Sequence, residues 1–321
     1  MKKLFLLMFL LLSLGTYSKD TVNIGVVLSS GGLGTGFNQM AYDGLKKAEA
    51  EGIVTFKYVE PNNISEDLAF LRDFSRDGSY DLIIGMGSVV AESIKKVATE
   101  FPDQKYAIIG GTITVPNTAT IDFKEQEMSF LAGALASMMS ESNKLGILLG
   151  MDNRSFNRFK HGFTQGALYI NRNSMVITSY MPTTSPNPFN DPVTGKNIAN
   201  LMTSRGVDVI LQVAEGSGQG VFESAKEKKI YAMGSDIDQD GEVPGVILTS
   251  VRVRIDNAIY NLITEIKNDK FKSGYRQFGL AENGVSLTDF NYTKELIGKE
   301  KLDRLKKLEK DIISGKIVVP E

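Results

Sequence analysis

The 321-residue chain contains no cysteine and no tryptophan, and it has a single histidine. The absence of cysteine excludes disulfides, thiolate nucleophiles, cysteine-based zinc sites and a lipid-modified N-terminal cysteine. A serine–histidine–aspartate triad would need His161, which lies within a helical pattern and is expected on a helix surface. The 36 Lys and Arg residues are dispersed among 38 Asp and Glu residues, so nucleic acid is not an expected partner.

The segment Met1–Ser18 predicts a cleavable export signal. Two lysines precede the apolar run Leu4–Leu14, and the small residues Thr16 and Ser18 stand at the spacing that a signal peptidase reads. The run is too short to span a bilayer comfortably. A eukaryotic secreted protein of this size usually carries disulfides, so we expect a bacterial periplasm and a protein that is not lipid-tethered.

The mature chain predicts an α/β fold in which strands alternate with amphipathic helices. About 300 residues suggest two domains, and two doubly wound parallel sheets of roughly five or six strands fit that length. We predict strands at Val22–Leu28, Val54–Val59, Leu82–Gly85, Tyr106–Ile109, Leu145–Leu149, Val176–Met181, Val207–Val213, Ile230–Met233 and Val246–Val251. We predict helices at Gln39–Glu51, Val90–Phe101, Asn157–Ile170, Lys196–Ser204, Gln219–Lys228, Ile255–Lys267 and Tyr292–Ser314.

The loops that follow these strands are rich in glycine, serine, asparagine and aspartate. Ligands of parallel sheets bind at the carboxyl ends of the strands. Loops of this composition on two lobes, facing one cleft, are typical of a binding protein, and the absence of a low-complexity linker predicts short crossings. The loops to examine are 29–38, 60–62, 86–88 (which includes Ser88), 110–112, 150–158, 214–220 and 234–238.

The glycine-rich loop after the first strand could suggest a dinucleotide site. Its pattern is Gly32-x-Gly34-x-Gly36, so the third glycine comes one residue early, and Phe37 stands where the motif needs it. Glu60 does follow the second strand, as a ribose-binding acid would. The match is weak, and an exported protein meets no pool of nicotinamide cofactor, so no cofactor is expected.

An alternating aspartate segment raises the alternative of a calcium loop. Asp236, Asp238 and Asp240 alternate, and Gly241 stands at the sixth position of such a loop. The twelfth position requires glutamate but holds Ile247, and a strand precedes the segment. We therefore expect no metal. Glycoside hydrolysis would need two carboxylates at a set separation, and no pair stands out in the sequence.

An ordered series of segments is similar to the basic membrane protein family of solute-binding receptors. The series runs SSGGLG, FNQMAYDGLKKA, DLIIGMGSVVAESIKKVATEFPDQKYAIIG, FKEQEMSFLAGALA, GILLGMD with NRFKHGFTQGA, PFNDPVTGK, GSGQGVFESAKEKKIYAMGSD and PGVILTSVRVRIDNAIY. The resemblance implies a type I periplasmic-binding-protein fold, a monomer without cofactor, and delivery of a small-molecule ligand to an inner-membrane ABC permease. It implies an N-terminal lobe of residues 19–125 with about 252–278, and a C-terminal lobe of residues 126–251 with about 279–321.

The resemblance also implies how a ligand is held. Phe37 and Phe189 match residues that sandwich a purine base, and Asp236 matches the acceptor of ribose hydroxyls. Asn38 and Gly216–Gly218 match residues lining the cleft. Glu215 stands where the family usually has glycine, so its carboxylate could add an acceptor or point away. The expected ligand-binding residues are Ser29, Ser30, Phe37, Asn38, Ser88, Phe189, Gly216 and Asp236.

Three departures from the family pattern leave the ligand open. Ser29 and Ser30 stand in place of an aspartate, Gly110 replaces an aspartate at the base edge, and Val253 replaces a lysine on the ribose side. If the chain around Val253 is extended, Arg252 and Arg254 point to the opposite face from Val253. A purine nucleoside is the first expectation, and a pyrimidine nucleoside, a modified purine or another aromatic solute are the alternatives. A nucleoside-processing enzyme and a ligand-presenting sensory receptor are the rival functions.

Overall fold

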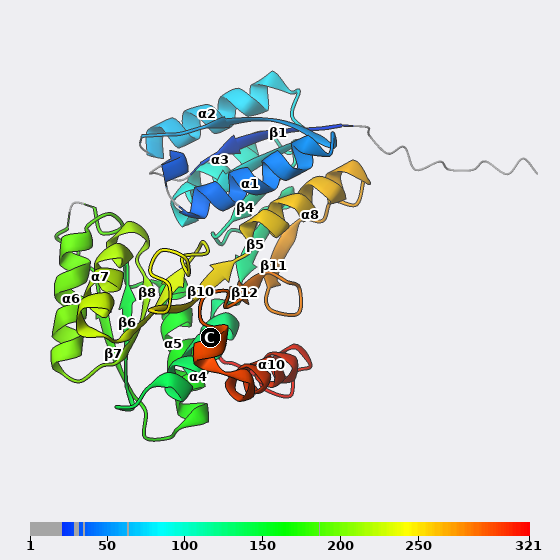
Figure 1. The fold of residues 1–321 in the computed structure, drawn as a ribbon. Helices are drawn as coiled ribbons and strands as arrows, with labels where there is room; N and C mark the ends of the chain where they lie inside the picture. The colour runs from blue at the N-terminus through cyan, green and yellow to red at the C-terminus, as the bar shows by residue number, and fades with distance from the viewer. Residues whose placement is uncertain (1–20, 29–31, 35, 63, 186) are drawn as a thin grey trace, which may run out of the picture.

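The computed structural model describes residues 21–28, 32–34, 36–62, 64–185 and 187–321, which form two six-stranded sheets in separate lobes (Figure 1). The first sheet has the strand order β11-β5-β4-β3-β1-β2, and all of its pairs are parallel. Its strands are β1 (Val22–Val27), β2 (Val54–Val59), β3 (Leu82–Met86), β4 (Tyr106–Ile109), β5 (Thr118–Phe123) and β11 (Gly274–Phe278). The predicted pair of parallel sheets is confirmed.

The second sheet repeats this arrangement with the order β12-β10-β9-β8-β6-β7. Its strands pair in parallel except β12, which runs antiparallel to β10 at the edge. They are β6 (Lys144–Leu149), β7 (Met175–Tyr180), β8 (Val209–Val213), β9 (Tyr231–Ser235), β10 (Ile247–Val253) and β12 (Val285–Leu287). The central strands β3 and β8 are buried throughout, as expected of strands covered on both faces.

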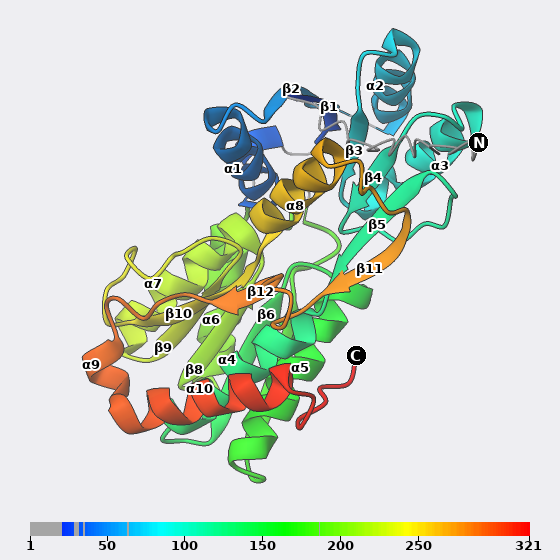
Figure 2. The same cartoon turned by 90° about the vertical axis from the view of Figure 1, so that its right-hand side faces the viewer.

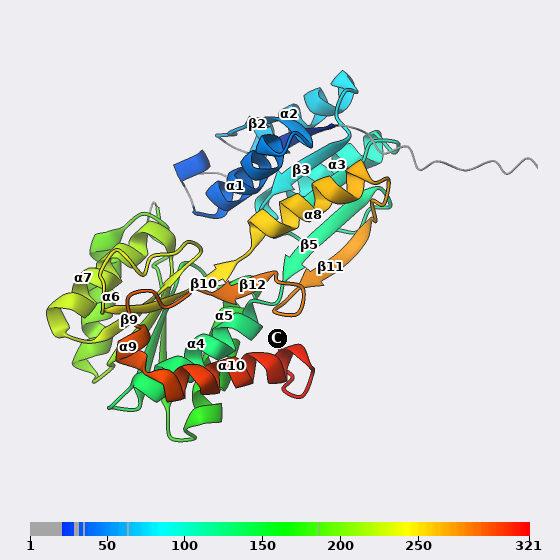
Figure 3. The same cartoon turned by 45° about the vertical axis from the view of Figure 1, so that its right-hand side comes forward.

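Helices cover both faces of each sheet (Figures 2 and 3). In the first lobe, α1 (Gly36–Ala50) and α8 (Ile255–Lys267) pack on one face, and α2 (Ile64–Asp77) and α3 (Ala91–Glu100) on the other. In the second lobe, α4 (Glu125–Met139), α5 (Arg154–Ile170) and α10 (Lys299–Ile313) share one core, while α6 (Pro192–Ser204) and α7 (Gly218–Lys228) cover the opposite face. The short α9 (Lys294–Ile297) and the 3₁₀ turns η1 (Gly32–Gly34), η2 (Ser88–Val90) and η3 (Glu215–Ser217) complete the described elements.

Glycines let α4 and α5 pack closely. A Cβ atom on Gly133 of α4 would lie 1.9 Å from the carbonyl oxygen of Phe163, and one on Gly166 of α5 would lie 1.9 Å from that of Phe130. Real side chains cannot approach so closely, so both positions require glycine. This packing leaves α4 buried on nearly every face, and no described helix combines the length and the apolar character needed to cross a membrane.

Three short segments pass between the lobes. Lys124 joins β5 to α4, Arg254 joins β10 to α8, and residues 279–284 join β11 to β12. Figure 3 shows these strands side by side at the narrow waist of the molecule. Such short crossings are suited to a hinge motion of the lobes.

Several element predictions need correction. The strands β5, β11 and β12 and the helices α2 and α4 are additional to those predicted. The single helix expected at Tyr292–Ser314 is divided, because Gly298 has a φ of 81° and separates α9 from α10. The expected surface position of His161 on α5 is confirmed.

Candidate functional site at the lobe junction

The two lobes approach each other at Gly36 and Asp236, a place we call the lobe junction. Gly36 begins α1 in the first lobe, and Asp236 directly follows β9 in the second. A Cβ atom on Gly36 would lie 3.3 Å from the Cβ atom of Asp236 and 3.5 Å from Cγ2 of Ile237. The start of a helix in one lobe therefore faces the carboxyl end of a strand in the other.

The ring of Phe37 lies against the glycine that ends β4. A Cβ atom on Gly110 would lie 2.9 Å from Cζ of Phe37, and Gly110 has a φ of 74°. A larger residue at position 110 would therefore collide with the ring and adopt an unfavourable backbone conformation. The sequence has Gly110 where the family pattern has an aspartate, and this glycine leaves room for the ring of Phe37. The Phe37 side chain is half-buried.

The ring of Phe189 has a similar setting in the second lobe. A Cβ atom on Gly150, directly after β6, would lie 2.2 Å from Cε1 of Phe189. Phe189 is half-buried, and its ring centroid lies 6.1 Å from that of Phe156 on α5. Each lobe thus contributes one phenylalanine, seated on the glycine that follows a central strand. Phe156 was missed by the sequence reasoning, although it lies within one of the loops marked for attention.

Asp236 is held in an unusual backbone conformation at the end of β9. Its φ is 68°, and its backbone N–H donates to the carbonyl oxygen of Val251 at 2.8 Å. Its Oδ2 atom accepts a hydrogen bond of 2.9 Å from the Ser235 hydroxyl. Burial raises the pKa of Asp236, and the Ser235 hydrogen bond opposes that rise only in part. The carboxylate is therefore poorly satisfied by the protein itself.

Glu215 lies next to Asp236, in an equally unusual conformation. It has a φ of 48° and begins η3, directly after β8 and Ala214. Burial, followed by the charge of Asp236, raises the pKa of Glu215 to about 7. Within the described ranges, its carboxylate takes part in no hydrogen bond or ion pair. The sequence left the direction of this side chain open; in the structure it lies close enough to Asp236 for that charge to raise its pKa.

The other predicted site residues have different settings. Asn38 is fully buried, and its Nδ2 atom donates to the carbonyl oxygen of Gly32 at 2.8 Å, which holds the turn η1. Ser88 is exposed at the start of η2. A Cβ atom on Gly216 would lie 3.1 Å from the carbonyl oxygen of Phe189, so glycine permits the close approach of that loop. The predictions for Ser29 and Ser30 lie outside the described residues.

The arginines near the crossing after β10 do not neutralise the acids of the junction. Val253 is buried in the core, and Arg254 makes a bidentate pair with Asp256 through hydrogen bonds of 2.9 and 2.8 Å. The Nε atom of Arg252 is buried without a hydrogen-bond partner. Arg252 acts electrostatically on Asp256, whose pKa it helps to lower.

Of the alternating aspartates, Asp240 serves internal structure. Asp240 accepts hydrogen bonds from Ser250 at 2.8 Å and from Thr288 at 2.6 Å. Over the residues that the structure describes, no group of three or more acidic or histidine side chains could hold a metal ion.

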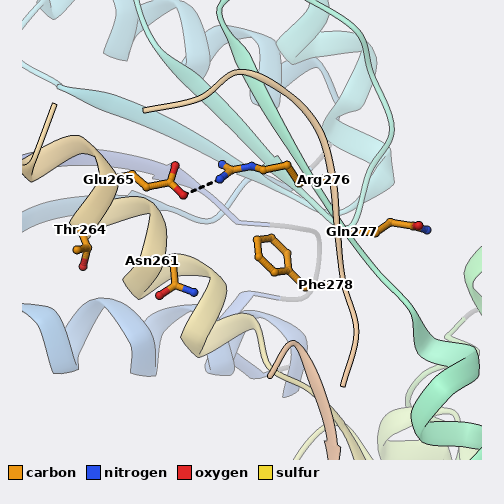
Figure 4. A pocket seen from close by; sticks show the side chains of 6 residues that line it. All are labelled: Asn261, Thr264, Glu265, Arg276, Gln277 and Phe278. Atoms are coloured by element: carbon orange, nitrogen blue, oxygen red, sulfur yellow. Dashed lines mark hydrogen bonds and ion pairs between the residues drawn. The ribbon is translucent and has the colours of Figure 1, made fainter. Parts of the chain in front are cut away.

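A pocket of about 530 Å³ lies elsewhere, between α8 and the edge strand β11 (Figure 4). An ion pair of 2.6 Å between Arg276 and Glu265 crosses it. None of the predicted ligand-binding residues lines this pocket; its lining consists of Asn261, Thr264, Glu265, Arg276, Gln277 and Phe278.

Comparison with known proteins gives consistent matches over most of the chain. The family model described as "ABC transporter substrate-binding protein PnrA-like" matches residues 21–321. The CD4+ T-cell-stimulating antigen of Listeria monocytogenes is 31% identical over 95% of this chain and 89% of its own length. The ABC transporter nucleoside-binding protein BmpA of Lactococcus lactis is 28% identical over 94% of this chain and 90% of its own. The crystal structure of an ABC transporter solute-binding protein from Aeropyrum pernix K1 has a TM-score of 0.80 and 28% identity, and covers 94% of both chains.

Proposed function

Because the chain belongs to the family of PnrA-like ABC transporter substrate-binding proteins, we propose that it captures a nucleoside-like aromatic solute between its lobes. The family implies a small-molecule ligand and a permease partner, and it is not a class of enzymes. The finer proposal is that the ligand is a nucleoside, with a purine nucleoside as the first candidate, and that the captured solute passes to an ABC importer.

The observation that carries this proposal is the pair of aromatic rings. Phe37 comes from the first lobe and Phe189 from the second, and each is half-buried on a glycine at the carboxyl end of a strand. A base stacked on an aromatic side chain gains about 1–3 kcal/mol, because every base has a π-face. Asp236 adds a carboxylate acceptor where the lobes approach, and a hydrogen bond to a charged acceptor contributes about 1.5–3 kcal/mol.

Closure follows from the division of the site between the lobes. A ligand that touches both rings and Asp236 favours the closed state, because only that state provides both halves of the site. The short crossings at Lys124 and Arg254 supply the hinge. We propose that the protein works as an exported monomer, facing an inner-membrane permease.

The first experiment is mass spectrometry of small molecules released by denaturing the purified protein, followed by calorimetry with inosine, adenosine and uridine. Phe37→Ala and Asp236→Ala should each weaken nucleoside binding by about tenfold or more. Tyr292→Ala, which changes an exposed ring, is the control and should leave affinity unchanged. Unchanged affinity in both site variants would contradict the site, and free base appearing from inosine would favour an enzyme instead.

A further inference from the structure

We propose that Glu215 sets the selectivity of the site. With Asp236 it forms a two-carboxylate acceptor that favours an aromatic ligand carrying a positively charged amino group over its neutral counterpart. This inference rests on the proposed function, because it concerns the same site. It goes beyond that function by naming the charge of the ligand.

The first step is the placement of the two acids. Strands β8 and β9 pair in parallel, with Leu211 opposite Met233. Continuing this register by three residues brings Ala214 beside Asp236, so Glu215 and Asp236 emerge at the same edge of the sheet. The charge of Asp236 contributes to the raised pKa of Glu215, in keeping with this placement. Because Gly36 adjoins Asp236, this edge faces the first lobe.

The second step is that the fold directs both side chains to this edge. Both residues have left-handed backbone conformations, which are uncommon for residues other than glycine. The backbone of Asp236 is held by Val251, and the turn after Glu215 is closed by the Ser217 N–H, which donates to the carbonyl oxygen of Ala214 at 3.1 Å. A different backbone conformation would break these hydrogen bonds. The acids therefore stay together although their charges repel each other.

The third step is the absence of a protein counter-charge in the described part of the chain. The elements against η3 are α6 and α7, and Lys196 of α6 is already paired with Glu223 and Glu227 of α7, at 3.3 and 2.7 Å. On β10, which pairs with β9, Arg252 acts on Asp256 and is not among the groups that shift the pKa of Glu215 or Asp236. Arg254 is paired with Asp256. The internal positions outside the described ranges cannot supply a cation, since they are Ser29, Ser30, Gly31, Thr35, Asn63 and Pro186.

The fourth step is the energetic consequence of closure. Bringing the lobes together removes water from two carboxylates that have no cation, and burying unpaired charge is strongly unfavourable. A ligand with a protonated amine supplies the missing charge and donors for both acids. A neutral nucleoside supplies hydroxyl donors only, so one acid must take up a proton. A ligand offering only acceptors at this position would be rejected.

The test compares matched probes by calorimetry at about pH 8, where Glu215 is ionised. The probes are adenosine and its 3′-amino-3′-deoxy and 5′-amino-5′-deoxy analogues. At least one amino analogue should bind about tenfold tighter than adenosine, since a hydrogen bond between charged groups exceeds a neutral one by about 1.4 kcal/mol. The preference should shrink at about pH 6, where Glu215 is protonated.

Glu215→Gln keeps the shape of the side chain and removes its charge. It should reduce the preference for the amino analogue over adenosine to about twofold or less. Glu215→Gly, which suits the backbone at this position, should behave in the same way and shows that any effect is not misfolding. Glu242→Gln is the control. Glu242 accepts a hydrogen bond from Gln219 and does not belong to the Glu215–Asp236 pair, so this change should leave the preference for the amino analogue intact.

The outcomes separate the two proposals. If adenosine binds but neither amino analogue exceeds it, or if the Glu215 variants leave the preference unchanged, the selectivity inference is wrong and nucleoside capture stands. If no nucleoside and neither analogue binds the parent protein, the proposed function fails and this inference fails with it.

Discussion

Two groups of acids lie where the lobes meet, and they differ in whether a described residue of the protein supplies a counter-charge. The hinge cluster consists of Asp122, Glu125 and Arg158. Arg158 is almost fully buried and donates to Asp122 at 3.0 and 2.8 Å, to Glu125 at 3.1 Å and to the carbonyl oxygen of Phe123 at 2.9 Å. The junction pair, Glu215 and Asp236, has no such partner within the described ranges.

The difference is visible in the pKa values of the two aspartates, Asp122 and Asp236. Burial raises the pKa of Asp122, but hydrogen bonds from Arg158 and Tyr275 outweigh burial and hold that pKa below its ordinary value. Burial raises the pKa of Asp236, and only a serine hydroxyl opposes it. The guanidinium of Arg158 stabilises the acids beside the crossing at Lys124, whereas we propose that the acids of the junction pair bind a ligand. The comparison predicts that changes in the hinge cluster act on stability and changes in the junction act on binding.

The largest expected effect is on the hinge side. Arg158→Met leaves Asp122 and Glu125 buried without their cation and should lower the free energy of unfolding by about 3–5 kcal/mol. Arg154→Met, on the same helix, removes only an exposed pair with Glu321 and should cost about 0–1 kcal/mol. Urea unfolding measures both. Equal losses in the two variants would contradict the role assigned to Arg158.

A pH test sharpens the comparison. Burial is the main cause that raises the pKa of Glu215 and of Glu125 to about 7, from an ordinary value of 4.5. Between these values the folded protein holds protons that the unfolded chain has released, so stability falls as pH rises. Glu215→Gln and Glu125→Gln should each flatten this slope, by about 1–3 kcal/mol over the window.

Bound ligand should then distinguish the two acids. A cationic ligand stabilises ionised Glu215 and lowers its pKa, while Glu125 lies in the hinge cluster and keeps its own. Carboxyl carbon NMR of free and bound protein follows both titrations. If ligand binding changed the pKa of Glu125 as much as the pKa of Glu215, the distinction between the hinge cluster and the junction pair would be lost.

A smaller effect separates ring placement from backbone strain. Gly110→Ala and Gly78→Ala both place alanine at a positive φ, 74° and 70°, but only position 110 adjoins a ring. Both variants should lose about 1–2 kcal/mol of stability. Only Gly110→Ala should also weaken ligand binding, by about tenfold, because it displaces Phe37. Calorimetry measures the ligand affinity of both variants, and urea unfolding measures their stability. Equal affinities of Gly110→Ala and Gly78→Ala would count against stacking of the ligand on Phe37.

The smallest expected effect is at the edge of the hinge cluster. Tyr275 donates to Asp122 at 2.6 Å but is itself exposed. Tyr275→Phe should lower the free energy of unfolding by about 1 kcal/mol and leave ligand affinity unchanged. Tyr292→Phe, an exposed tyrosine in the second lobe, serves as the reference for both measurements. A change of affinity in Tyr275→Phe would show that the hinge cluster also contributes to binding.

The sequence predicted best where hydrophobic periodicity was strong. The helix Ile255–Lys267 and the strands Val54–Val59 and Tyr106–Ile109 were predicted at their observed bounds, because each pairs an apolar face or run with clear flanking signals. Family motifs pointed to Phe37, Phe189 and Asp236, which the structure places near the lobe junction or on strand-end glycines. Their role as ligand contacts stays a prediction.

The missed elements share a physical reason. The helix α4 is buried on almost every face, so its sequence lacks the polar stripe by which a helix is recognised. In β5, buried Thr118, Thr120 and Asp122 interrupt the apolar run. The edge strand β12 is too short to show a clear alternation of apolar and polar residues, and its position depends on pairing with β10. Tertiary contacts decide such segments.

By itself, the sequence determined the alternation of strands and helices, the two sheets and the family, because periodicity and ordered motifs are local properties of the chain. Only the tertiary structure decided which acids obtain a cation. Asp122 and Arg158 are 36 residues apart and meet beside the crossing at Lys124, whereas Glu215 and Asp236 meet through strand register and find no cation among the described residues. Electrostatic pairing depends on distance in space, which no spacing along the chain reports.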